Sequence, residues 1–230
     1  MTDILISVDL RSEFGPARNQ GSRPTCMAFA ASDAHAGLRG GWAPLSCEYA
    51  FYQAQRRAGR PPNKGALLSS MLDALREVGQ PEESSWPYLS ATPTDSASWI
   101  PPATVGKLFG RAGEKCPTSL DQIIDELNQG RPVIILLMLS RAFYNYNPAT
   151  QGVIHPAAGE APEPARRHAV TAVGHGKVSA DRAILIRNSW GERWGVGGYG
   201  WLTEPFLGPR IFAAAKLTED VDVPAHPAAA

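Results

Sequence analysis

The spacing of apolar side chains predicts helices in the first part of the chain and strands in the second. Apolar residues recur at three- and four-residue intervals from Leu67 to Val78, just before Gly79, which indicates an amphipathic helix that packs on one face. Residues 133–139 instead form an uninterrupted apolar run that follows a Gly and a Pro. Such a run is typical of a strand buried on both faces.

Helix start and stop signals add three more helices. Residues 25–39 read as an Ala-rich helix that ends at a Gly pair. Ser46 is a candidate N-cap for a second helix, and Thr118 or Ser119 can cap a third that runs to Gln129. Further strands are predicted at four places: residues 169–173, 183–188, 199–203 and 212–217.

This order of elements predicts an α+β protein, built as one domain or as two closely packed lobes. A stretch rich in Pro, Ser and Thr ends near residue 102 and marks the change from helices to strands. We therefore expect a mainly helical lobe over residues 1–105 and a strand-rich lobe over residues 106–217. Residues 218–230, rich in Pro and Ala, are expected to form a disordered tail.

Charge and hydropathy exclude several classes of partner. Twenty-two basic residues balance twenty-two acidic ones, so we expect no nucleic-acid partner, which would favour a basic face. No apolar run approaches the roughly 20 residues of a membrane span, and we expect no membrane partner. The first nine residues lack the basic and apolar segments of a signal peptide. We expect a cytoplasmic protein, or one exported by a route independent of a signal peptide.

Of the three cysteines, Cys26 stands where a helix favours thiolate chemistry. It follows Pro24 and Thr25 and lies in the first turn of the predicted helix, where unpaired backbone N–H groups and the helix dipole stabilise an anion. By itself a Cys on an Ala-rich helix is more often a small buried apolar residue. Cys47, in the first turn of the next helix, is interpreted as structural.

Four motifs together change the interpretation of Cys26. They are Asn19-Gln20-Gly21, Cys26 with Ala28-Phe29, His168-Ala169-Val170, and Asn188-Ser189-Trp190-Gly191. In this order and spacing the chain resembles the papain and cathepsin family of cysteine peptidases over nearly its whole length. The resemblance implies the papain-like two-lobe fold: a helical lobe, an antiparallel β-barrel-like lobe, and the active-site cleft between them.

The same resemblance assigns catalytic roles. Cys26 is the implied nucleophile and His168 its acid–base partner. Asn188 orients the imidazole, and Gln20 donates a hydrogen bond to the oxyanion together with the backbone N–H of Cys26. Trp190 is expected to shield the His–Asn hydrogen bond from water.

Substrate-binding positions follow from the resemblance as well. Gly65 matches a glycine that pairs with the substrate backbone, and we extend this segment to Ala66 and Leu67. Leu136 is expected to line the pocket for the second residue upstream of the cut. Ala169 and Trp190 complete the expected substrate-binding set.

Two groups of residues depart from the family pattern near the expected active site. Pro24, Thr25 and Met27 stand where Gly, Ser and Trp are usual, and Arg23 replaces a cysteine that forms a disulfide in secreted members. Arg166 and Arg167 precede the catalytic His, where Asn or Asp is common. If either points at the imidazole, it disfavours the imidazolium and favours acidic substrate residues.

The resemblance implies a cysteine protease that hydrolyses peptide bonds through a thioester, with a peptide or protein as substrate. We expect no cofactor, and no metal because the sequence has neither a CxxC pair nor an HExxH motif. A bacterial intracellular protease and a secreted effector or toxin both fit, the latter with an inhibitor or immunity protein as partner. The alternatives are a transferase, deamidase or isopeptidase of narrow specificity, and a non-catalytic binding protein on the same scaffold.

Overall fold

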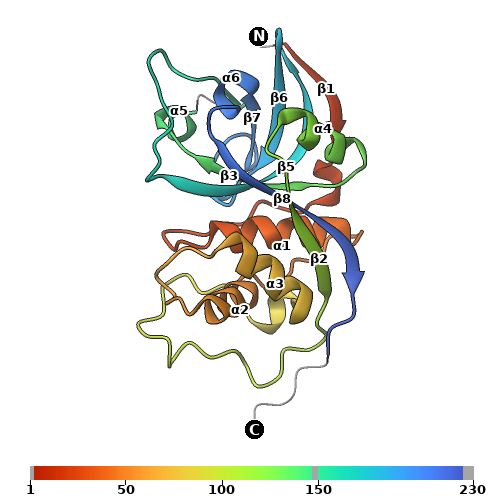
Figure 1. The fold of residues 1–230 in the computed structure, drawn as a ribbon, viewed down its shortest axis with the longest axis vertical. Coiled ribbons are helices and arrows are strands. Elements are labelled where there is room, and N and C mark those ends of the chain that lie inside the picture. Colours follow the sequence, from red (N-terminus) through yellow and green to blue (C-terminus); the bar gives the residue numbers. More distant parts are fainter. Residues whose placement is uncertain (1–2, 147–149, 225–230) are drawn as a thin grey trace. The chain divides into compact units, whose positions relative to one another are not determined.

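A computed structural model describes residues 3–146 and 150–224, and it divides the chain into two compact units. The strand unit consists of Met1–Asn19 and Lys115–Lys216, and the helical unit of Gln20–Glu114 and Leu217–Ala230. The first nineteen residues count with the strand unit because their strand pairs there. Both units are drawn in Figure 1.

The helical unit is built on three helices, α1 (Cys26–Leu38), α2 (Cys47–Ala58) and α3 (Leu68–Glu77), with a 3-10 turn at Glu83–Ser85 (Figure 1). The Ser46 side chain accepts a hydrogen bond from the backbone N–H of Tyr49, so Ser46 caps α2 as expected. α1 is buried on nearly every side, which its run of small Ala side chains permits.

Strand β5 (Arg167–Val178) is the centre of the strand unit. Its first half pairs with β3 (Val133–Met138), its second half pairs with β1 (Ile4–Asp9), and its other edge pairs with β6 (Asp181–Arg187). All three pairings are antiparallel. Gly174 and Gly176 lie where β1 crosses, and a Cβ at either position would overlap a backbone oxygen of β1.

The remaining strands complete one sheet whose order is β2-β8-β3-β5-β6-β7-β4. They are β2 (Gly110–Cys116), β4 (Val153–Ile154), β7 (Tyr199–Thr203) and β8 (Ile211–Val221). The short β4 pairs parallel to β7, whereas the other described strand pairs are antiparallel. β2 and β8 each contribute residues to both units.

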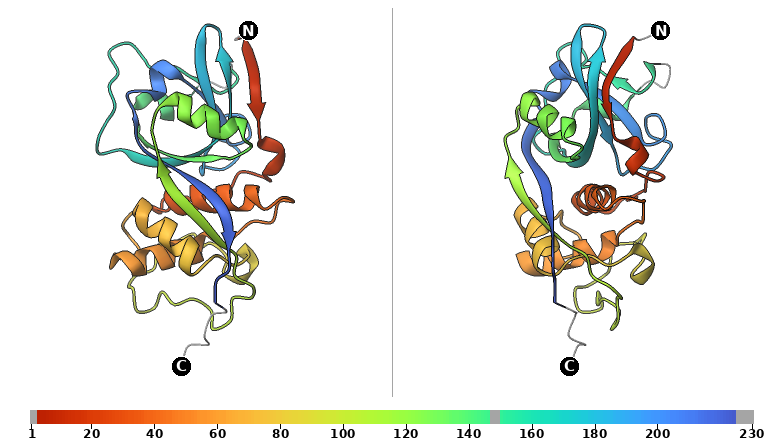
Figure 2. Two further views of the ribbon diagram at one scale, coloured as in Figure 1. Left: turned by 45° about the vertical axis from the view of Figure 1, so that its right-hand side comes forward. Right: turned by 90° about the vertical axis from the view of Figure 1, so that its right-hand side faces the viewer.

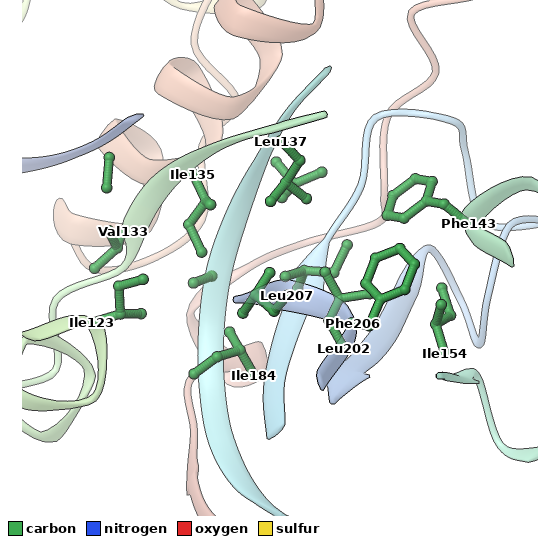
Figure 3. Packing of buried hydrophobic residues seen from close by; sticks show 14 of the residues in the cluster. Ile123, Val133, Ile135, Leu137, Phe143, Ile154, Ile184, Leu202, Phe206 and Leu207 are labelled. Carbon is green, nitrogen blue, oxygen red and sulfur yellow. The ribbon is translucent and has the colours of Figure 1, made fainter. Parts of the chain in front are cut away.

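Among its described residues, the strand unit has three α-helices: α4 (Leu120–Asn128), α5 (Arg141–Tyr144) and α6 (Glu204–Leu207). α4 packs against β3 and β5 (Figure 2), and α6 packs against β6 and β7. Figure 3 shows the apolar core beneath them, with Ile123 of α4, Ile135 of β3, Ile184 of β6 and Phe206 of α6. Core residues of β3 and β6, the strands on either side of β5, therefore hold β5 in place.

The elements confirm the predicted α+β class, and the helices and strands predicted from pattern all occur, with ends shifted by a few residues. The predicted tail is wrong in part, because Thr218–Val221 continue β8 as hydrogen-bonded strand, and Arg111 donates to the Thr218 carbonyl oxygen. Residues 225–230 of that tail lie outside the described residues. β1 and β2 were not predicted: β1 is apolar in sequence but mostly exposed, and the second half of β2 is polar and not buried.

The buried His35 of α1 makes the stability of the helical unit dependent on pH. Burial, then the nearby Arg111, lowers its pKa to about 3, although a hydrogen bond with Gln80 acts the other way. Folding therefore keeps His35 neutral, whereas an unfolded chain takes up a proton below about pH 6.5. The stabilisation is complete above pH 6.5 and is lost as the pH falls towards 3.

We expect His35→Gln, which keeps a neutral hydrogen-bonding side chain, to weaken this acid sensitivity. Between pH 7 and pH 5 the wild-type protein should lose about 2 kcal/mol of unfolding free energy that the variant retains. Urea unfolding at a series of pH values measures the difference. Equal pH dependence in the two proteins would contradict the assignment to His35.

Candidate active site

The topology of the strand unit places His168 beside Asn188. His168 is the second residue of β5, opposite Leu137 of β3, and Asn188 directly follows the last residue of β6. Because β5 and β6 are antiparallel neighbours, the start of one strand lies at the end of the other. The sheet thus brings together two residues that are twenty positions apart.

The two side chains share a buried hydrogen bond. His168 Nε2 lies 2.7 Å from Asn188 Oδ1, and the backbone N–H of Ser189 donates to the same oxygen at 2.8 Å. The contact with the backbone N–H of Ser189 identifies Oδ1 as the carbonyl oxygen of the Asn188 amide, which can only accept a hydrogen bond. Nε2 of the ring therefore carries the proton. In the neutral ring Nδ1 is then the basic nitrogen.

Aromatic rings cover this pair. The Trp190 ring lies 4.8 Å from the His168 ring, and Phe143 of α5 makes edge contacts with both. Tyr144 stacks on Trp190 with the ring planes 22° apart. His168 is only 6% exposed as a result. The arrangement is consistent with the predicted shielding role of Trp190, which stays a prediction.

Burial sets the protonation state of His168. It lowers the pKa to about 4, and the hydrogen bond to Asn188 offsets part of this effect. An imidazolium at this position therefore needs a neighbouring anion to form at neutral pH. A thiolate is the kind of anion that supplies this stabilisation.

The two arginines before His168 are held by other groups of the strand unit. Arg166 pairs with Glu163 at 2.5 Å and lies over the Tyr144 ring. The Arg167 side chain donates to the carbonyl oxygen of Pro164 and lies over Phe212. Neither guanidinium is a cause of the lowered pKa of His168, which burial dominates. The expected preference for acidic substrate residues stays a prediction.

In the helical unit, Cys26 is the first residue of α1 and is partly exposed. Its N-cap, Thr25, shares a hydrogen bond with the Tyr88 hydroxyl at 2.8 Å. The thiol therefore stands at the positive end of a thirteen-residue helix, where the thiolate is favoured. Cys47 is completely buried in α2, in keeping with a structural residue. None of the three cysteines forms a disulfide.

Gln20 is oriented by contacts inside the helical unit. Its Nε2 donates to the Arg23 carbonyl oxygen at 2.8 Å, and its own carbonyl oxygen accepts from the Tyr88 hydroxyl at 2.7 Å. Side chain and backbone of Gln20 are thus both fixed next to the start of α1. The motif predicted Gln20, but nothing local in the sequence identified Tyr88 as its partner.

The predicted substrate-binding residues lie in different units. Gly65, Ala66 and Leu67 directly precede α3, where Leu67 is the N-cap in an extended conformation with an exposed side chain. Leu136 and Ala169 belong to the strand unit, where they are register partners on β3 and β5. Their proposed roles rest on the family pattern and stay predictions.

Residues 3–146 and 150–224 contain no group of three His, Cys, Asp or Glu side chains placed to hold a metal ion. Within the same residues, no helix has the length and apolar character that crossing a membrane requires.

Sequence comparisons place these residues in a family context. Residues 6–205 match the family described as "Papain family cysteine protease". Cysteine proteinase 2 of Entamoeba histolytica is 30% identical over 203 residues, which is 84% of this chain and 62% of that protein. Papaya proteinase 4 of Carica papaya is 28% identical over 213 residues, 86% of this chain and 56% of that protein. The chain spans less than two thirds of the length of these curated relatives.

The fold comparison agrees. Xylellain, a cysteine protease from Xylella fastidiosa, superimposes with a TM-score of 0.73 over 92% of this chain and 85% of that one, at 22% identity. At this identity the likeness concerns the fold alone, and it confirms the predicted papain-like α+β fold.

The geometry predicts the behaviour of the His168 ring when no thiolate is present. In a Cys26→Ala variant we expect His168 to remain neutral down to about pH 5, with its proton on Nε2. Burial keeps the pKa near 4, and the oxygen of Asn188 selects the tautomer. Two-dimensional ¹⁵N–¹H NMR of the ring measures both properties. Titration near pH 6.5, or a proton on Nδ1, would contradict the buried hydrogen bond.

Proposed function

This chain belongs to the papain family of cysteine proteases, and we propose that it hydrolyses peptide bonds with Cys26, His168 and Asn188 as catalytic residues. The observation that carries the proposal is the 2.7 Å hydrogen bond between His168 Nε2 and Asn188 Oδ1. It leaves Nδ1 as the basic nitrogen of a buried ring, which is what the activation of a thiol requires.

In the first step, the Cys26 thiol transfers its proton to Nδ1 of His168. The resulting thiolate is stabilised by the N-terminus of α1 and by the imidazolium. Burial alone lowers the pKa of His168 to about 4, so the imidazolium is stable at neutral pH only while the thiolate accompanies it. The Cys26 thiolate and the His168 imidazolium therefore form together and are neutralised together.

The thiolate then attacks the scissile carbonyl carbon, and the carbonyl oxygen becomes an oxyanion. Gln20 Nε2 and the backbone N–H of Cys26 donate hydrogen bonds to it, each contributing about 2.7–4 kcal/mol of barrier lowering. His168 gives its proton to the leaving amine, which departs and leaves a thioester on Cys26. Water, deprotonated by His168, attacks the thioester and releases the acid and the thiol.

The substrate is proposed to be an extended peptide. Gly65, Ala66 and Leu67 offer backbone for strand-like pairing, and the extended conformation of Leu67, the N-cap of α3, supports this role. Leu136 and Ala169 are proposed to line the strand-unit side of the substrate site, with Trp190 beside His168. The predicted preference for acidic substrate residues is part of the same proposal.

We propose a reducing compartment as the working environment. Three cysteines outside disulfides, and Arg23 in place of a disulfide cysteine, support this setting. The cytoplasm of the producing bacterium provides it, and so does the cytoplasm of a cell that receives the protein as an effector. In the second case, a proteinaceous inhibitor or immunity protein is the proposed partner.

A peptidyl epoxysuccinate tests the proposal, because it traps a thiolate only where a peptide also binds. We expect one covalent adduct, on Cys26, found by intact mass and peptide mapping, and its loss in His168→Ala. Cys47→Ala is the matched control and should label normally, since Cys47 is buried. Labelling of Cys26 that does not depend on His168 would contradict the proposed pair.

A library of diverse peptides then separates the alternatives. Broad cleavage supports the proposed protease. An adduct on Cys26 without peptide cleavage would favour a transferase, deamidase or isopeptidase that acts on one folded protein. No adduct, with Cys26 still reduced, would favour a binding protein on the same scaffold.

A further inference from the structure

We propose that the buried ion pair between Arg23 and Glu48 is a positioning device for the oxyanion donors, acting through the backbone carbonyl of Arg23. This inference rests on the proposed function, since it assigns Gln20 and the N–H of Cys26 to the oxyanion. Every contact in the argument lies within the helical unit.

The ion pair is dry and has two directed contacts. Arg23 Nη1 lies 2.5 Å from Glu48 Oε2 and Nη2 lies 3.0 Å from Oε1, so the fork of the guanidinium meets both carboxylate oxygens. Both side chains are 0% exposed. The Arg23 guanidinium also lies over the rings of Phe51 and Tyr88, 5.7 and 4.9 Å from their centroids.

Glu48 in turn is held by two uncharged donors. The Trp99 Nε1–H donates to Oε1 at 2.7 Å, and the backbone N–H of Leu89 donates to Oε2 at 3.1 Å. Arg23 Nη1 also donates to the Leu89 carbonyl oxygen at 2.7 Å. The carboxylate therefore has fixed partners in addition to Arg23, and the position of the guanidinium is determined by groups far from residue 23 in sequence.

The backbone carbonyl of Arg23 connects the ion pair to the proposed oxyanion donors. Its carbonyl oxygen accepts from the Gln20 side chain at 2.8 Å and from the backbone N–H of Thr25 at 2.9 Å. An amide nitrogen carries two hydrogens in a plane, so anchoring one hydrogen sets the direction of the second. The Thr25 contact sets the backbone that enters α1 one residue before Cys26. One carbonyl thus constrains both proposed oxyanion donors.

The stability of the fold does not explain this arrangement. A buried ion pair loses so much hydration that well-packed apolar residues often serve equally well. What an apolar pair cannot do is fix the arginine backbone through directed contacts at the far end of the side chain. Oxyanion donors require this, since they must already be oriented when the negative charge develops.

The test replaces the pair by neutral residues of similar size, Arg23→Met with Glu48→Gln. We expect a folded protein whose kcat on a peptide substrate falls about tenfold to a hundredfold with little change in KM, because the donors are displaced. Alkylation of Cys26 by iodoacetamide passes through no oxyanion, so its rate should stay within about twofold of wild type. Arg57→Met with Glu77→Gln, which removes an exposed pair of the same unit, is the matched control and should leave both rates unchanged.

A Gln20→Ala background identifies the route of the effect. If the pair acts through Gln20, replacing it in that background should cost much less of kcat than in the wild type. An equal loss in both backgrounds, or alkylation that slows in parallel with hydrolysis, would overturn the inference in favour of a purely structural role. Should the neutral pair fail to fold, Arg23→Lys keeps the charge without the fork, and we expect a smaller loss of kcat with the same dependence on Gln20.

A separate measurement distinguishes failure of this inference from failure of the proposed function. In the wild type the Gln20 side-chain amide hydrogens should exchange slowly by NMR, and replacing the pair should accelerate their exchange whether or not any peptide is cleaved. Absence of hydrolysis by the wild type would remove the proposed function alone. Unchanged amide exchange on replacing the pair would overturn the inference even in an active protease.

Discussion

The backbone hydrogen bonds of β5 are the interaction on which the strand unit depends. This strand pairs with β3 and β1 along one edge and with β6 along the other, so it has no exposed edge over most of its length. His168 sits at its start and takes its partner from the end of β6. The geometry of the site is therefore a consequence of strand register, and a slip of one residue would turn the imidazole to the other face.

The helical unit positions its proposed site residues by other means. Cys26 and Gln20 stand at the end of a helix and in the loop before it, where no ladder of backbone hydrogen bonds is available. There, the Arg23–Glu48 ion pair, the Tyr88 hydroxyl and the Arg23 carbonyl oxygen hold the loop in place. Strand register thus positions the proposed site residues of the strand unit. A buried ion pair and its hydrogen bonds position those of the helical unit.

Local sequence signals predicted most of the fold and the candidate site. Ser46 and Ser119 cap helices as their positions suggest, and the apolar run after Pro132 is a buried strand. What the sequence did not predict depends on distant partners. β1 is mostly exposed and is a strand only because β5 accepts it, and the role of Phe143 follows from a four-residue helix placed over His168 by the core. Glu48 lies in the first turn of α2, and its pairing with Arg23 spans a loop that no local pattern describes.

The choice of an ion pair at Arg23 also determines how this loop responds to heat. The hydration that a buried pair gives up becomes less favourable as temperature rises, so the penalty for burying the charges shrinks, while the contribution of apolar contacts levels off. The segment before α1 should therefore keep its cohesion on warming better than its apolar surroundings do. In this protein, the temperature at which the nucleophile loop loosens and the temperature at which the core melts need not coincide.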